Sequence, residues 1–164
     1  MDDGKTDFKR KLCKDRQETF EDWEKAYSRT KSEIESLINS FDAIKTIPNP
    51  VFQDLTIKFY TIHLCNFFVF HVRKILIDRN KQTKTQNILR SNFSNPSNTP
   101  SPSVMNNLLD YLIEDADLLQ CLSEYYKKIQ TIRNKYAHGA SAETSFNITM
   151  DEFKEIFVKI QTLS

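Results

Sequence analysis

Residues 50–80 read PVFQDLTIKFYTIHLCNFFVFHVRKILIDRN, and this stretch decides the fold. Between Ile57 and Val72 apolar residues fall on nearly every side of a helix that turns about 100° per residue. A helix that is apolar all round is buried on all sides, so we predict that this stretch forms the central helix of a bundle. The side chains that we expect in the core are Phe59, Ile62, Phe67, Phe68, Val69 and Phe70.

The start of the central helix is marked by the sequence IPNP at residues 47–50. Asn49 is placed to cap the helix, and Pro50 takes the first helical position, where its missing N–H costs nothing. The longest charge-free run, residues 59–72, contains two histidines and one asparagine and is shorter than the roughly 20 apolar residues that a membrane span needs. The charged N-terminus has no apolar core of the signal-peptide kind. We therefore expect a cytoplasmic protein with no membrane partner.

Two segments beside the central helix have opposite character. From about residue 7 to residue 47 there is no glycine or proline, and apolar residues recur at helical spacing, which predicts one long helix, or the same helix broken near residues 28–32. Residues 81–103 are rich in Ser, Asn, Thr and Pro and lack apolar periodicity, so they predict a mobile loop.

The C-terminal half contains signals for three more helices. Ser103 is predicted to cap the third helix, and a fourth runs from about residue 118 to residue 138, where Gly139 supplies the left-handed residue after its end. The last helix is expected over residues 149–163, opening with the capping box TMDE at residue 149.

Composition supports one all-helical domain over residues 1–164, a compact up-and-down bundle of about five helices. The chain has only two glycines, against roughly 11 expected at average usage, while tight hairpins and phosphate-binding loops both need glycine. With 23 Lys and Arg against 22 Asp and Glu, the net charge does not suggest binding of nucleic acid by the whole surface. The three cysteines form no CxxC pair, so we expect a reduced compartment, no metal and no other cofactor.

The predicted fourth helix has an apolar seam with spacing 4, 3, 4, 3 and 4, which we expect to pack against the central helix. The seam is Leu118, Leu122, Tyr125, Ile129, Ile132 and Tyr136. Arg133 lies on its shoulder, so its stem is expected to be half-buried. Arg133 and His138 are about 140° apart around the axis and do not converge within one straight helix. Either the last turn loosens, or two chains bring their copies together across a two-fold axis.

Residues 133–138, Arg-Asn-Lys-Tyr-Ala-His, read as R-N-x-x-x-H near the end of a late helix. This pattern in an all-α chain resembles the signature of the HEPN superfamily. The resemblance implies a compact helical bundle that acts as a metal-independent RNase, commonly in toxin–antitoxin, abortive-infection or other anti-phage systems. It also implies a homodimer whose two motifs face each other, with RNA as substrate and an antitoxin or sensor protein as a further partner.

The residue types of the motif suit such chemistry, because RNA carries its own nucleophile, the 2′-OH. We predict three catalytic residues: His138, with an ordinary pKa of about 6.5, as general acid or base, Arg133 as the donor to the phosphate, and Asn134 orienting either the ring or a phosphate oxygen. The predicted product is a 2′,3′-cyclic phosphate, formed without a divalent ion. The substrate-attracting cations are predicted to be Lys127, Lys128 and Lys135.

An alternative interpretation is a non-catalytic, HEPN-like helical interaction module. In that case Arg133 is a surface cation at a helix end, Asn134 is solvated, and His138 only precedes a glycine cap. The exposed aromatic residues then form the interface with a partner. His63 and His71, eight residues apart, lack further ligands for a metal and are expected to be packing residues.

Overall fold

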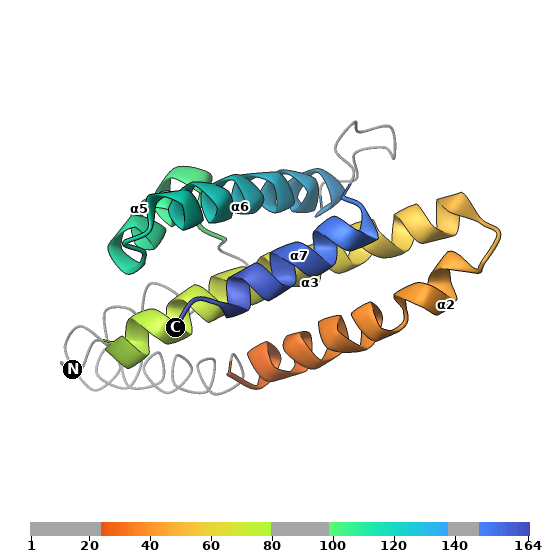
Figure 1. Cartoon of the computed structure of the whole chain (residues 1–164), viewed down its shortest axis with the longest axis horizontal. Coiled ribbons are helices and arrows are strands. Elements are labelled where there is room, and N and C mark those ends of the chain that lie inside the picture. Colours follow the sequence, from red (N-terminus) through yellow and green to blue (C-terminus); the bar gives the residue numbers. More distant parts are fainter. Residues whose placement is uncertain (1–23, 80–98, 138–147) are drawn as a thin grey trace, which may run out of the picture.

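The computed structural model describes residues 24–79, 99–137 and 148–164, and in these residues the chain is helical without any strand (Figure 1). The helical stretches are residues 24–39, α2 (Phe41–Lys45), α3 (Pro50–Arg79), α5 (Pro102–Leu112), α6 (Ala116–Ala137) and α7 (Met150–Gln161). The prediction of a compact all-α bundle is confirmed.

The central element is α3, and the other long helices pack around it (Figure 1). The ring of Phe67 packs against Tyr27 on one side and Phe157 of α7 on the other, with ring centroids 5.4 Å and 5.0 Å apart. The Phe68 ring packs against Tyr126 of α6, at 5.2 Å. Residues 24–39 and α6 run antiparallel to α3, and α7 runs antiparallel to α6, as an up-and-down bundle requires (Figure 1).

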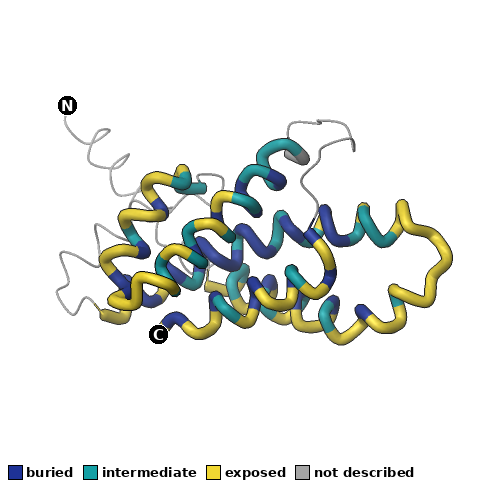
Figure 2. Tube along the Cα trace, turned by 45° about the horizontal axis from the view of Figure 1, so that its top comes forward, coloured by how far each residue is buried: buried dark blue, intermediate teal, exposed yellow. Residues whose placement is uncertain are grey.

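The part of α3 from residue 61 to residue 77 is mostly buried, as its sequence predicts, but its first turns are not. Phe67 and Phe68 are fully buried, while Phe59 is 54% exposed and Ile62 is only half-buried. Placing Phe59 in the core was therefore wrong. The turn from α2 into α3 and the first turns of α3 are exposed (Figure 2), because among the described residues α6 and α7 cover other faces of this helix.

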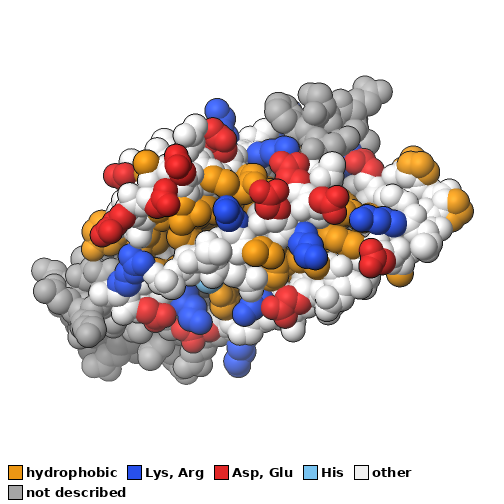
Figure 3. Space-filling model, viewed as in Figure 1, with side chains coloured by type: hydrophobic (Ala, Val, Ile, Leu, Met, Phe, Trp, Pro, Cys, Tyr) orange, Lys and Arg blue, Asp and Glu red, His pale blue; other side chains and the backbone are white. Residues whose placement is uncertain are grey.

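By length and composition α3 is also apolar enough to span a membrane, and 56% of its most apolar window is buried inside the bundle. The centre of a helical bundle requires the same composition, and α3 lies there. On the face shown in Figure 3, acidic and basic side chains are interspersed between apolar ones, in line with the nearly balanced charge of the chain.

Two of the predicted helix starts are confirmed and one is wrong. The side-chain oxygen of Asn49 accepts the N–H of Phe52 (3.2 Å), and the Thr149 hydroxyl accepts the N–H of Glu152 (3.1 Å). The third helix is capped by Ser101 and not by Ser103, because Pro102 takes its first position and the Ser101 hydroxyl accepts the N–H of Val104 (3.3 Å). Residue 103 therefore lies inside α5 and not in a loop.

The first helix is broken at a different place from the one predicted. The helix passes through residues 28–32 without interruption and ends at residue 39, before α2 begins. At the break, the Ser40 hydroxyl donates to the carbonyl of Ser36 (2.8 Å). The side chain thus takes an acceptor that a backbone N–H would use in a continuous helix. Residues 7–23 and 80–98, which belong to the predicted helix and the predicted loop, lie outside the described residues.

Candidate functional site

Arg133 lies in the last turns of α6 and is half-buried, as predicted. Its Nη1 donates to the hydroxyl oxygen of Thr99 (3.1 Å) and to the side-chain oxygen of Asn134 (3.0 Å). Its Nε is buried and has no hydrogen-bond partner among the described residues. The guanidinium is thus held through one nitrogen, while the edge formed by Nε and Nη2 makes no hydrogen bond to the described part of the chain.

Thr99 is in place because two further side chains of α6 hold the segment that contains it. The Tyr126 hydroxyl donates to the carbonyl of Pro100 (2.6 Å), and the Gln130 amide donates to the same oxygen (3.3 Å). Tyr126, Gln130 and Arg133 follow one another on one side of α6, about one turn apart. This side of α6 therefore fixes the chain that leads into α5.

The Arg133 guanidinium also influences two buried groups. Burial raises the pKa of the Cys65 thiol to about 12, and the positive charge of Arg133 opposes this shift. Burial likewise raises the pKa of Tyr126, again opposed by Arg133. Both groups are protonated at neutral pH, so neither is a nucleophile or a base beside Arg133.

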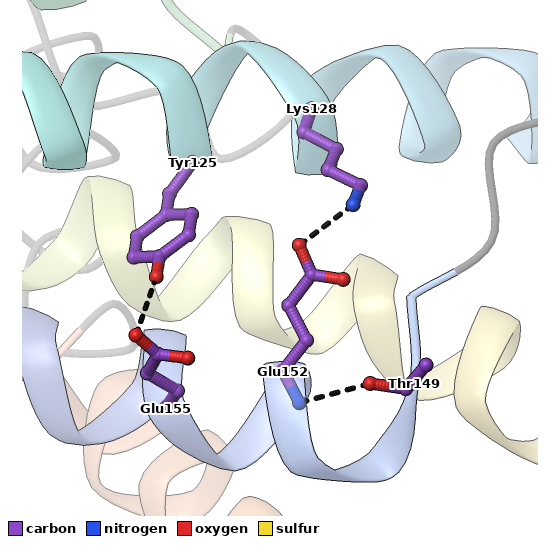
Figure 4. A network of polar contacts seen from close by, with 5 residues as sticks. All are labelled: Tyr125, Lys128, Thr149, Glu152 and Glu155. Atoms are coloured by element: carbon purple, nitrogen blue, oxygen red, sulfur yellow. Dashed lines mark hydrogen bonds and ion pairs between the residues drawn. The ribbon is translucent and has the colours of Figure 1, made fainter.

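Tyr126 is a neighbour of the candidate site that the sequence pattern missed. The predicted seam included Tyr125, whose hydroxyl instead reaches α7 and donates to Glu155 (2.8 Å; Figure 4). Tyr126 is fully buried against α3 in its place. Residues 122, 126 and 129 also have the spacing of a helical seam, so the sequence of α6 fits burial of either tyrosine against α3. The position of α7 decides which of the two is buried.

The predicted substrate-binding lysines have different surroundings. Lys127 is exposed, and Lys135 is half-buried. Lys128 forms an ion pair with Glu152 of α7, at 2.6 Å between its Nζ and the carboxylate (Figure 4). The charge of Lys128 is therefore largely compensated, and its side chain joins α6 to α7.

Asn134 is half-buried, and its amide oxygen is occupied by Arg133. Its amide nitrogen has no hydrogen-bond acceptor in the described ranges, so it is the part of this side chain that is open to an imidazole or a phosphate oxygen. His138 and Gly139 lie outside the described residues. The predicted pairing of Asn134 with His138, and the approach of Arg133 to His138, remain predictions.

The two histidines of α3 have partners of their own. His71 accepts the Tyr27 hydroxyl at Nδ1 and donates from Nε2 to the carbonyl of Leu163, both at 2.9 Å. These roles are those of a neutral ring, and burial favours this form by lowering the pKa of His71. His63 lies 3.7 Å from the carboxylate of Glu33. In the described ranges no three His, Cys, Asp or Glu side chains are grouped so that they could hold a metal ion.

Comparisons of the chain with models of protein families, with curated proteins and with solved structures find no match. The all-α architecture therefore rests on the structure itself. The likeness to HEPN proteins rests on residues 133–138 alone.

Proposed function

We propose that the chain is a metal-independent endoribonuclease of the HEPN type, working in the cytosol in a toxin–antitoxin, abortive-infection or other anti-phage defence system. One observation supports this function above the others. Nη1 of Arg133 is fixed by Thr99 and Asn134, Nη2 makes no hydrogen bond to the described residues, and Nε is buried. A guanidinium held at one terminal nitrogen can donate from the other to a phosphate oxygen, with an orientation set before the substrate arrives.

In the proposed reaction the RNA 2′-OH attacks the adjacent phosphorus and displaces the 5′-oxygen of the next nucleotide. Arg133 stabilises the negative charge that develops on the phosphate oxygens. His138 transfers a proton as general base or acid, and the Asn134 amide nitrogen orients either the imidazole or a phosphate oxygen. The products are a 2′,3′-cyclic phosphate and a free 5′-hydroxyl. Exposed Lys127, together with Lys135, attracts the RNA strand.

The composite site of the proposal needs two chains. Residues 133 and 138 do not converge within one straight helix, so we expect Arg133 of one protomer and His138 of one or the other protomer to line a cleft in a homodimer. An antitoxin or sensor protein is the expected partner that controls the activity. No metal or other cofactor takes part.

The direct test is RNA cleavage by the purified full-length chain in EDTA. We expect the wild type to cut, His138→Ala to be inactive, and Arg133→Lys to be slower by about 100-fold or more, since a flexible ammonium cannot replace the fixed, planar guanidinium. Arg29→Ala is the matched control, because Arg29 is an exposed arginine whose ion pair among the described residues is with Glu33, one helical turn away. Loss of cutting in EDTA, or full cutting by His138→Ala, contradicts the proposal.

A second candidate function, the non-catalytic interaction module, is favoured by a different observation. Several large apolar side chains at the start of α3 are exposed to solvent. Under this alternative the chain binds a partner through these side chains and cuts no RNA, and neither His138→Ala nor Arg133→Lys changes the binding.

A further inference from the structure

The outer face of α5 carries apolar side chains that are open to solvent. Val104, Leu108 and Tyr111 are spaced 4 and 3 residues apart, so they follow one another along one face of the helix. Val104 is 48% exposed and Tyr111 is 69% exposed, while Leu108 is half-buried. We call these three residues the α5 seam.

The α5 seam lies away from the faces of α5 that build the bundle. Each residue of the seam directly precedes a buried residue, and successive residues lie about 100° apart around a helix. The buried residues are Met105, Leu109 and Leu112. On another side of α5, the side-chain oxygen of Asn106 accepts the Ser123 hydroxyl of α6 at 2.6 Å. The core and α6 thus take two sides of α5, and the seam is left on the outside.

All charged residues close to the α5 seam in the chain are acidic. Residues 99–126 contain five Asp and Glu and no Lys, Arg or His, whereas the 23 Lys and Arg of the whole chain would place about four in a stretch of this length. Figure 3 shows acidic and apolar side chains gathered where Figure 1 places α5 and its turn into α6. This part of the surface therefore differs from the rest of the chain, whose charges are balanced.

Three exposed carboxylates accompany the α5 seam, in the last turn of α5 and in the turn that follows it. We call them the acidic rim, and they are Asp110, Glu114 and Asp115. In the described ranges none of the three forms an ion pair. Arg79 reaches the end of α5, but it donates to the backbone oxygens of Leu112 and Ser164 and not to these carboxylates.

We propose that the α5 seam and its acidic rim bind a basic amphipathic helix of a partner protein. Apolar side chains of the partner, one helical turn apart, cover the seam, and Lys or Arg side chains beside them pair with the rim. The carbonyl end of α5 adds partial negative charge at the same place. The surface thus offers apolar contact and negative charge together.

The charge of the rim favours this occupant over others. A second copy bound through the same face would bring two acidic rims together. In addition, the α5 seam exposes only roughly 200 Å² of apolar side chain, about half of the apolar share of a standard interface. RNA and anionic lipid surfaces are negatively charged, so the rim repels them. A cationic helix is the class of partner that gains from both features of this surface.

The α5 seam begins close to the segment that holds Arg133. Val104 is five residues after Thr99, whose hydroxyl accepts Nη1 of Arg133 at 3.1 Å. A helix bound to α5 therefore lies beside the chain that fixes the guanidinium. We assign this surface to the protein that controls the activity. That role rests on the proposed function, whereas binding to the seam does not.

The test is the binding of a fluorescent peptide to the purified full chain, followed by fluorescence anisotropy at about 0.15 M salt. The probe is an amphipathic helical peptide of Leu and Lys, about five turns long, and its counterpart carries Glu in place of every Lys. We expect a dissociation constant in the micromolar range for the Lys peptide, and binding at least about 100-fold weaker for the Glu peptide.

Variants of the chain locate the surface that binds the peptide. Tyr111→Ser should weaken binding of the Lys peptide by about tenfold or more. The triple variant Asp110→Asn, Glu114→Gln and Asp115→Asn should weaken it by a similar factor and make it less sensitive to salt. Asparagine at residue 115 keeps the cap that the Asp115 carboxylate gives to α6.

Two matched controls carry the same kind of change at other exposed apolar sites. Phe59→Ser in α3 and Val158→Ser in α7 alter side chains that are 54% and 51% exposed, and both variants should bind the Lys peptide as the wild type does. Circular dichroism checks that each variant is folded. If Tyr111→Ser fails to fold, Val104→Ser takes its place, with the same expected loss.

Three outcomes overturn the proposal. The first is that neither peptide binds, or that the Lys and Glu peptides bind equally. The second is that Phe59→Ser weakens binding as much as Tyr111→Ser does, because the peptide then binds at the start of α3. The third is that Tyr111→Ser lowers the mass of the chain in light scattering, because a second copy then covers the seam. None of these measurements uses RNA, so they can fail independently of the cleavage assay.

Discussion

Removing the hydroxyl of Tyr126 tests how firmly the segment before α5 is held on α6. In the folded chain this hydroxyl donates to the carbonyl of Pro100 at 2.6 Å, and Gln130 donates to the same oxygen at 3.3 Å. Tyr126→Phe keeps the fully buried ring and deletes only the shorter of the two hydrogen bonds. The change therefore isolates one polar contact within a packed core.

The two donors share one acceptor, and this sets the expected magnitudes. Tyr126→Phe should lower the free energy of unfolding by about 1 kcal/mol, because the Pro100 carbonyl still has Gln130 as a partner. Gln130→Met should cost a similar or smaller amount for the same reason. The double variant leaves the part-buried carbonyl without either donor, so we expect it to cost about 1 kcal/mol more than the sum of the single changes.

The assay is urea unfolding followed by circular dichroism at neutral pH, with thermal unfolding as a check. For a chain of this length each kcal/mol corresponds to about 2–4 °C in Tm. Tyr125→Phe is the matched control, because the Tyr125 hydroxyl donates to the exposed carboxylate of Glu155 and its loss should cost about 0.5 kcal/mol or less. If Tyr126→Phe costs no more than Tyr125→Phe, or if the two changes at residues 126 and 130 are additive, the reasoning is refuted.

Three further predictions concern single groups. Burial lowers the pKa of His71 in the folded chain, so below about pH 6.5 the unfolded chain binds a proton more readily than the folded chain does. The free energy of unfolding, measured in urea, should therefore fall as the pH is lowered. In His71→Gln this fall should be smaller. Cys65 is buried and its pKa is raised to about 12, so its thiol should not react with maleimide in the folded chain, while the half-buried Cys121 should. Peptide mass mapping would show which cysteine is modified. Modification of Cys65 in the folded chain would contradict its burial. Thr149→Ala deletes the cap of α7 and should lower the free energy of unfolding by about 1 kcal/mol in urea titrations; an unchanged midpoint would mean that the cap contributes nothing.

Much of the fold could be predicted from local chemistry. The start of α3 at Pro50 and the start of α7 after Thr149 follow from residues that satisfy the free N–H groups of a helix, and these signals lie next to the ends that they mark. The buried face of α7 follows from its helical periodicity, and its predicted core residues are buried. These are Phe153, Ile156, Phe157 and Ile160.

What could not be predicted depends on neighbours far away in the sequence. Because α3 is apolar on nearly every side, its sequence does not say which face lacks a partner, and Phe59 looked as suited to the core as Phe67. The choice between Tyr125 and Tyr126 likewise depends on where α7 lies. At the candidate site, the half-burial of Arg133 could be predicted from its position beside the apolar seam of α6. Its contact with Thr99 could not, because nothing in the sequence around residue 99 indicates that this segment packs on α6.

Arg79, in the last turn of α3, holds two other chain segments at once. Its Nη1 donates to the carbonyl of Leu112 at the end of α5 (3.1 Å), and its Nη2 donates to the backbone oxygen of Ser164, just beyond α7. The carbonyl end of α5 carries partial negative charge, and the cation of Arg79 balances it while also binding the chain that follows α7. If one of these segments frays, Arg79 loses one of its two acceptors, and its side chain is then less firmly placed for the other. A lysine has a single nitrogen in place of the planar guanidinium, so it would not bind both segments at once.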